Sequence, residues 1–112
     1  MKRPRQLPDT ITIGPVEYQV RVNDPYFDTN DQLGACSNAA QALILLNLEH
    51  PAAEHELVDT IWHEILHAID DIYRIPMSER RVVQLAQAIT AVMQQNPQLM
   101  RFMLAHQSGR RS

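Results

Sequence analysis

At the centre of the chain stands the stretch Thr60-Ile61-Trp62-His63-Glu64-Ile65-Leu66-His67-Ala68-Ile69, inside the longest helical pattern of the sequence. From about Ala52 to Arg74 apolar residues recur at helical spacing, and Pro51 suits a first helical turn. The apolar stripe consists of Val58, Ile61, Trp62, Ile65, Ile69 and Ile72. This stripe predicts an amphipathic helix that packs one face against the core.

Within this helix, His63, Glu64 and His67 form the motif H-E-x-x-H. Residues i and i+4 share one helical face, so both imidazoles can bind one Zn²⁺ at about 2.0 to 2.1 Å. Glu64 is offset by one residue, where its carboxylate can take a proton from metal-activated water. On a helical wheel the histidines lie away from the isoleucine stripe, so metal binding does not compete with packing. The alternative is a solvated helix face with two ordinary histidines and a surface carboxylate.

Two further helices are expected after the motif. Ser78 can cap a second helix that follows Pro76, and Asn96-Pro97 ends it. The same pair can start a short third helix, Gln98 to about His106, with Asn96 as its cap and Pro97 at its first position. The expected buried face of the second helix comprises Val82, Val83, Ala86, Ile89 and Met93.

A third metal ligand is expected at Glu79, because a catalytic zinc site commonly has three protein ligands and a water. Glu79 follows His67 by a short connection and stands three residues before Val82, on the expected inward stripe. An inward carboxylate needs a partner. The alternative is a first-turn acidic residue that favours the helix dipole.

Other polar residues near the motif have less defined roles. Asp70 and Asp71 share the helix of the histidines, so they are expected to accept hydrogen bonds from ligand imidazoles or to be surface charges. The remaining histidines lack metal-type spacing and are expected on loops or the surface: His50, His55 and His106. Three tyrosines could stabilise an oxyanion, with packing as the alternative: Tyr18, Tyr26 and Tyr73.

The first half of the chain favours β-strands. Ile11–Ile13 and Val16–Val22 alternate apolar and polar residues, with Gly14-Pro15 as the expected turn of a hairpin. Asn23-Asp24-Pro25 stops the second strand, and a polar loop leads to Leu33-Gly34. One further strand is expected to end at Ala42–Leu46, although so short an apolar run could be helical. The pattern predicts an α+β domain.

Size and composition restrict the function further. A chain of 112 residues suits one domain, and a net charge of -3 argues against nucleic acid as the main partner. The longest apolar run, Ala42–Leu46, is too short to span a bilayer, so no membrane partner is expected. Cys36 is the only cysteine and cannot form an intramolecular disulfide. A cytoplasmic location is therefore expected, with Cys36 as a part-buried structural residue.

In the order of these elements the chain resembles the small zincin-like metallopeptidases of phages and bacteria, and it is similar to the minimal gluzincins. The resemblance covers about Ile11 to Leu104 and rests on Thr60–Ile69, on Ser78–Ala86 and on the Asn96-Pro97 helix end. It implies a small zincin-like α+β fold, in which an antiparallel sheet packs on the motif helix and a following helix. It also implies an edge strand, here the segment ending near Leu46, that pairs with an extended peptide.

By position, the resemblance gives zinc binding to His63, His67 and Glu79, and activation of water to Glu64. The expected function is a zinc-dependent metallopeptidase, a hydrolase acting on peptides or proteins. The expected organisation is a flexible tail at 1–10, one domain at 11–106 and a second flexible tail at 107–112. Two alternatives stay open. The first is a zinc-binding domain without turnover, in which the metal is structural or the cleft is blocked by Leu99–His106, and the second is a metal-free interaction module.

Overall fold

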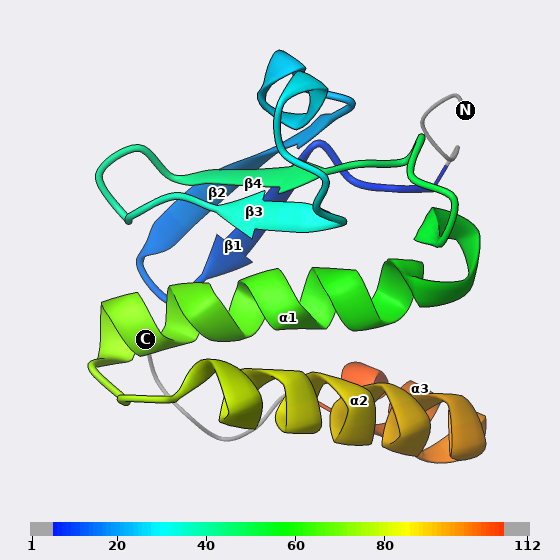
Figure 1. Cartoon of the computed structure of the whole chain (residues 1–112). Coiled ribbons are helices and arrows are strands. Elements are labelled where there is room, and N and C mark those ends of the chain that lie inside the picture. Colours follow the sequence, from blue (N-terminus) through cyan, green and yellow to red (C-terminus); the bar gives the residue numbers. More distant parts are fainter. Residues whose placement is uncertain (1–5, 107–112) are drawn as a thin grey trace.

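The computed structural model describes residues 6–106, and it confirms the predicted α+β class. These residues form a four-stranded sheet, a short 3₁₀-helix and three α-helices. In chain order the elements are β1 (Thr10–Ile13), β2 (Val16–Val22), η1 (Pro25–Asp28), β3 (Gly34–Cys36), β4 (Leu43–Leu46), α1 (Ala53–Tyr73), α2 (Glu79–Gln95) and α3 (Pro97–Ala105). Figure 1 shows the sheet on one side of α1 and α2 on the other.

The predicted hairpin of β1 and β2 is confirmed. The strands pair antiparallel, and Ile13 stands opposite Val16 across the Gly14-Pro15 turn. Gly14 has a φ of 56°, in the left-handed region that favours glycine. The turn also lies against the ring of Tyr73 at the end of α1, where a side chain on Gly14 would clash. The sheet is thus anchored to the far end of the motif helix.

The prediction of an antiparallel sheet is wrong at the centre. The strand order is β1-β2-β4-β3, and β4 pairs parallel with β2 and antiparallel with β3. The segment ending at Leu46 is therefore a central strand, and the edge strand next to it is β3. The connection from β2 to β4 contains η1 and β3, which gives the chain the length that a parallel crossover needs.

The single strand expected before Leu46 is two strands. Ser37 and Asn38 turn the chain between them: the Ser37 hydroxyl accepts from the Leu43 amide at 2.8 Å, and the Asn38 side-chain oxygen accepts from the Gln41 amide at 3.0 Å. Ala42 then takes a φ of 51° before β4 begins. This turn brings β3 to the edge of the sheet that lies over α1.

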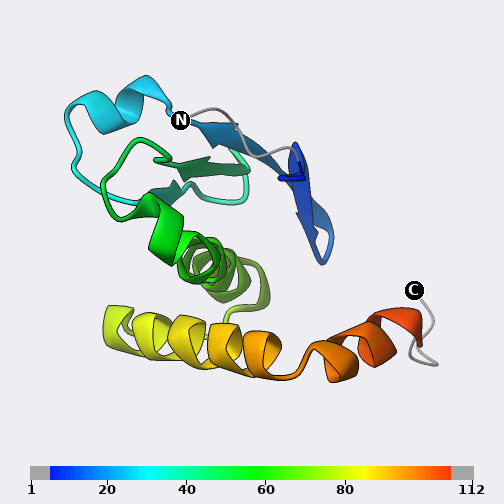
Figure 2. The same cartoon turned by 90° about the vertical axis from the view of Figure 1, so that its right-hand side faces the viewer.

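Figure 2 shows the motif helix α1 between the sheet and α2. Its apolar residues therefore face in two directions. Leu57, Ile61, Ile65 and Ile72 pack on the sheet core, while Trp62 and Leu66 pack with the α2 residues Val82 and Ala86. The sheet core consists of Ile13, Tyr18, Val20, Ile44, Leu46, Leu48 and Ala68. The apolar residues of α1 thus form two faces, one toward the sheet and one toward α2, and not the expected single stripe. A third face of α1 lies below β3.

The predicted second and third helices are confirmed within a residue or two, with two differences. Val83 is 38% exposed and does not belong to the buried face of α2, whereas Val82 and Ala86 do. The Asn96 side chain donates to the Val92 carbonyl at 2.9 Å and does not cap α3. α3 continues outward from the end of α2, as Figure 2 shows.

The predicted tails, residues 1–10 and 107–112, lie only partly within the described residues. Residues 1–5 and 107–112 lie outside the described residues. Leu7 packs against the sheet core, and Thr10 already belongs to β1. Over residues 6–106 the helices lack the combination of length and apolar character that crossing a bilayer requires.

Candidate metal centre

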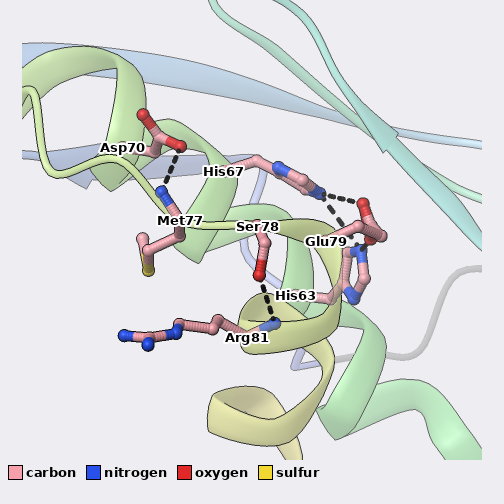
Figure 3. Close-up of polar contacts among 7 residues, drawn as sticks. All are labelled: His63, His67, Asp70, Met77, Ser78, Glu79 and Arg81. Carbon is pink, nitrogen blue, oxygen red and sulfur yellow. Dashed lines mark hydrogen bonds and ion pairs between the residues drawn. The ribbon is translucent and has the colours of Figure 1, made fainter.

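The structure brings together the three side chains that the sequence predicts as metal ligands (Figure 3). Glu79 Oε1 lies 2.7 Å from His63 Nε2, and Glu79 Oε2 lies 3.3 Å from His67 Nε2. The two Nε2 atoms are 3.1 Å apart. One ligand atom from each residue fits within 4.8 Å of the others, so the group could hold a metal ion.

Both histidines owe their direction to the packing of α1. The isoleucines of α1 fix one face of the helix on the sheet, and Leu66 fixes another against α2. His63 and His67 lie on the remaining face with side chains 25% and 34% exposed. Because they are one turn apart, their rings project in the same direction, as the motif predicts.

Glu79 is placed by the tight connection between α1 and α2. Arg74 ends α1 in the left-handed conformation, with φ 55° and ψ 48°. The Asp70 carboxylate accepts a hydrogen bond from the Met77 amide at 3.2 Å, and the Ser78 hydroxyl accepts from the Arg81 amide at 3.2 Å (Figure 3). Ser78 thus caps α2 as predicted, and Glu79 follows as its first residue. The Glu79 side chain is 64% exposed, so it reaches the histidines from the open side of the site and not from a buried stripe.

The chemistry of this group fits a divalent ion. Two imidazole nitrogens and a carboxylate converge, and the lone pairs of such acceptors repel one another unless a proton or cation lies between them. Tetrahedral ligands bound at zinc distances lie about 3.3 Å apart. The observed separations of 3.1 and 3.3 Å match that spacing, and the 2.7 Å contact is the closest of the three.

Glu64 lies beside this group, and it is the most buried acidic residue of α1. It is only 5% exposed, and it makes no hydrogen bond within residues 6–106. Burial, followed by the negative charge of Glu79, raises the pKa of Glu64 to about 8. A nearby dication would act in the opposite direction and favour the carboxylate. Its environment therefore suits proton exchange near neutral pH.

Gly34 allows β3 to lie directly above Glu64. A Cβ built on Gly34 would stand 2.8 Å from Thr60 Cγ2 and 2.9 Å from Glu64 Oε2. The sequence pattern places Leu33-Gly34 after a polar loop and does not indicate this contact. The signal that could have found this contact is a glycine at the start of a strand, which often marks a close backbone approach.

The candidate ligands His63, His67 and Glu79, called the metal group below, line a cleft of about 540 Å³ between the edge strand β3 and the two helices. This cleft is called the metal cleft. Its upper wall is β3 with the following Ser37-Asn38 turn, and its floor is the open face of α1. Of the three tyrosines, only Tyr26 lines this cleft, and its hydroxyl donates to Gln32 Oε1 at 2.9 Å. Tyr18 is fully buried, and Tyr73 lies over the Gly14 turn.

Neither aspartate after the motif accepts a hydrogen bond from a ligand imidazole, which was one of the two roles expected for them. Asp70 binds the Met77 amide, and the Asp71 carboxylate accepts from the Ala39 amide at 2.9 Å. Each carboxylate holds a connection beside the site: Asp70 holds the α1–α2 turn and Asp71 holds the turn after β3.

The remaining predicted residues lie apart from the group or in its wall. His50 Nδ1 accepts from the Ala52 amide, and His106 stacks on Phe102 in α3. Cys36 is half-buried in the cleft wall, where burial, followed by the charges of Glu64 and Asp71, raises its pKa to about 12. The thiol therefore stays protonated at neutral pH.

The arrangement as a whole joins an ion-binding group, a buried carboxylate and an open cleft under an edge strand. An ion held there would polarise a bound carbonyl, and Glu64 could exchange a proton beside it. These are the parts that metal-assisted hydrolysis requires. No protein-family model, curated protein or solved structure with which the chain was compared matches it.

Proposed function

We propose that this protein is a zinc-dependent metallopeptidase in which His63, His67 and Glu79 hold the ion and Glu64 is the general base. The observation that carries the proposal is the convergence of two imidazoles and one carboxylate beside a buried, unpartnered glutamate. A structural zinc site is closed by four protein ligands, whereas a catalytic site keeps one position open. The described residues supply three ligands, and this number favours catalysis.

The chain's own residues divide the chemistry between them. Zinc supplies a Lewis acid that polarises the peptide carbonyl and makes water a stronger acid. Glu64 takes the proton of that water and later delivers it to the leaving amine. Burial leaves Glu64 only 5% exposed, and Gly34 leaves room for its carboxylate under β3.

The edge strand favours an extended peptide as the substrate. β3 pairs with β4 on one side only, and the cleft runs beneath it past Glu64 and the metal group. A peptide in extended conformation can hydrogen-bond to such an edge and lay a carbonyl over the ion. The strand that the resemblance implies for this role is thus β3 and not the segment ending at Leu46.

The described chain does not block its own cleft. Leu99–His106 was the segment expected to cover it in the alternative without turnover. None of these residues lines the cleft, and α3 leads away from the end of α2 (Figure 2). The cleft is therefore open to a substrate.

The decisive variant is Glu64→Gln. Zinc should still bind with one ion per chain, because Glu64 is not a ligand, while hydrolysis of a peptide library by the zinc-loaded protein should disappear. Glu17→Gln on the exposed side of β2 is the matched control and should retain full turnover. His63→Ala should lose both zinc and hydrolysis. Turnover that survives in Glu64→Gln would remove Glu64 from the mechanism, and a natural protein that binds no zinc would overturn the proposal.

A further inference from the structure

A second hollow adjoins the metal cleft on the side of the α1 N-terminus. It has a volume of about 350 Å³ and lies between the start of β3, the first turns of α1 and the α2 segment 83–87. It shares Gln32, Gly34, His63 and Glu64 with the metal cleft. The two hollows therefore form one continuous groove, with Glu64 where they meet. A substrate peptide whose cleaved bond lies beside Glu64 would place a neighbouring side chain in this second hollow.

The charge of this hollow is negative. This charge comes from Glu56 and Asp59, which line it from α1, whereas the Glu64 carboxyl group lies where the two hollows meet. Neither lysine nor arginine is among the described residues that line it. Within residues 6–106 the carboxylates of Glu56 and Asp59 make no ion pair or hydrogen bond. The hollow thus offers negative charge without a cation of its own.

The walls of the same hollow are apolar. Leu33, Val83 and Ala86 line it opposite the carboxylates. This position explains why Val83 is 38% exposed although it belongs to an otherwise apolar part of α2. Long cationic side chains have this same division, with an apolar stem and a charged head.

Glu64 gives independent support for a ligand in the groove. A carboxyl group that is 5% exposed is expected to make hydrogen bonds, because a buried polar group without a partner is costly. The described chain supplies no donor to it. Glu64 lines both hollows, so its hydrogen bonds are made to water or to a ligand that enters the groove.

From these observations we propose that the hollow between Leu33, Asp59 and Val83 binds a lysine or arginine side chain of the substrate, next to the cleaved bond. The stem packs on Leu33 and Val83, and the cationic head lies at Asp59 and Glu56. This inference rests on the proposed function, since a side-chain subsite serves a peptide substrate. It makes the enzyme selective for basic sequences.

The test uses the full chain and two small probes, N-acetyl-arginine amide and its neutral isostere N-acetyl-citrulline amide. Binding is followed by chemical shifts of backbone amides at low ionic strength. The arginine probe should bind about three- to tenfold more tightly, with shifts centred on Asp59 and Gln87. Asp59→Asn combined with Glu56→Gln should bring the two affinities together. Asp28→Asn, on the exposed η1, is the matched control and should keep the preference.

A second variant tests the same arginine preference without removing a carboxylate. Gln87 lines the hollow from α2 and is exposed, so Gln87→Lys places a tethered cation there. It should abolish the preference for arginine over citrulline. In parallel, paired arginine and citrulline peptides are digested by the zinc-loaded protein, and the arginine peptides should be cleaved faster.

The outcomes separate this inference from the proposed function. Equal binding of both probes to the natural protein, or a preference that survives in all variants, would overturn the subsite. Preferential arginine binding that the variants abolish, without hydrolysis of any peptide, would support the subsite and count against the metallopeptidase. Equal rates of hydrolysis for arginine and citrulline peptides would support the metallopeptidase and overturn the subsite.

Discussion

The Tyr18 hydroxyl is buried without a hydrogen-bond partner among the described residues. A hydroxyl removed from water without a partner costs free energy, whereas the aromatic ring of Tyr18 contributes to the sheet core. Tyr18→Phe removes the cost and keeps the ring. We expect the free energy of unfolding to stay the same or to rise by about 1 kcal/mol.

Chemical denaturation of the natural protein and the variant checks this expectation. Tyr26→Phe is the matched control, because the Tyr26 hydroxyl does donate a hydrogen bond, to Gln32. That variant should lose a few tenths of a kcal/mol, since its bond is exposed. A clear loss of stability in Tyr18→Phe would show that its hydroxyl has a role in the core.

Cys36 should be a slow nucleophile despite its place beside the candidate site. Only the thiolate reacts, and a pKa of about 12 leaves very little thiolate at pH 8. We expect alkylation by iodoacetamide at pH 8 to be at least about tenfold slower than for free cysteine. The rate should rise with pH well beyond pH 9.

Two comparisons make this test specific. Unfolding the protein in guanidinium should restore the ordinary cysteine rate, because burial is the largest cause of the raised pKa. A variant that combines Cys36→Ser with Ala40→Cys moves the thiol to an exposed turn position and should react quickly. Rapid alkylation of folded Cys36 would contradict its half-buried, protonated state.

At the level of single residues, the three members of the metal group could be predicted from the sequence, because the H-E-x-x-H spacing has few structural interpretations. His63 and His67 share a helical face by geometry alone, and Glu79 follows a connection short enough to fold back. The roles of Gly34 and Asp71 depend on β3 lying above α1. That contact joins parts of the chain about thirty residues apart, and no local pattern indicates it.

Among the elements, the start of α2 is the one on which the metal group most depends. Ser78 caps this helix, and the next residue is Glu79. Ser78→Ala should cost about 1 kcal/mol of stability, because an N-cap hydrogen bond is lost. Zinc affinity should fall as well, since the first turn of α2 would no longer hold Glu79 toward the histidines.

A conservative variant separates capping from other effects of the substitution. Aspartate also caps helices, so Ser78→Asp should keep both the stability and the zinc affinity of the natural protein. Stability is measured by denaturation, and affinity by competition with a zinc chelator. Equal zinc affinity in Ser78→Ala and the natural protein would show that Glu79 is held by other contacts.

The helices were predictable from sequence and the sheet was only partly so, for a physical reason. α1 and α2 carry long periodic patterns, a proline or serine at their starts and a clear end at Asn96. The strands β3 and β4 are short, and the turn at Ser37-Asn38 depends on side-chain hydrogen bonds that the polar composition alone does not specify. The parallel pairing of β2 with β4 follows from the crossover and not from either strand.

At the scale of the whole molecule, a metal ion should tie α1 to α2. Both helices contribute ligands, so an ion binds the folded state and stabilises it by mass action. With free zinc at about a hundred times its dissociation constant, we expect a gain of about 2.7 kcal/mol. Unfolding can be followed by the fluorescence of Trp62, the only tryptophan, which packs between the two helices.

The controls for this measurement use the ligand chemistry. Magnesium prefers oxygen ligands and should give little shift in the unfolding temperature at the same concentration. Glu79→Gln and His67→Ala should each reduce the zinc shift, and a chelator should reverse it in the natural protein. An unfolding temperature that zinc leaves unchanged would contradict binding at this group.

The placement of all three ligands on two successive helices has a consequence for assembly. His63, His67 and Glu79 come from one short stretch of chain, and the sheet contributes none of them. Little loop entropy is lost when such a helical hairpin closes. A divalent cation can therefore staple α1 and α2 together as an early nucleus of folding, whereas the enclosure of Glu64 must wait for the arrival of β3.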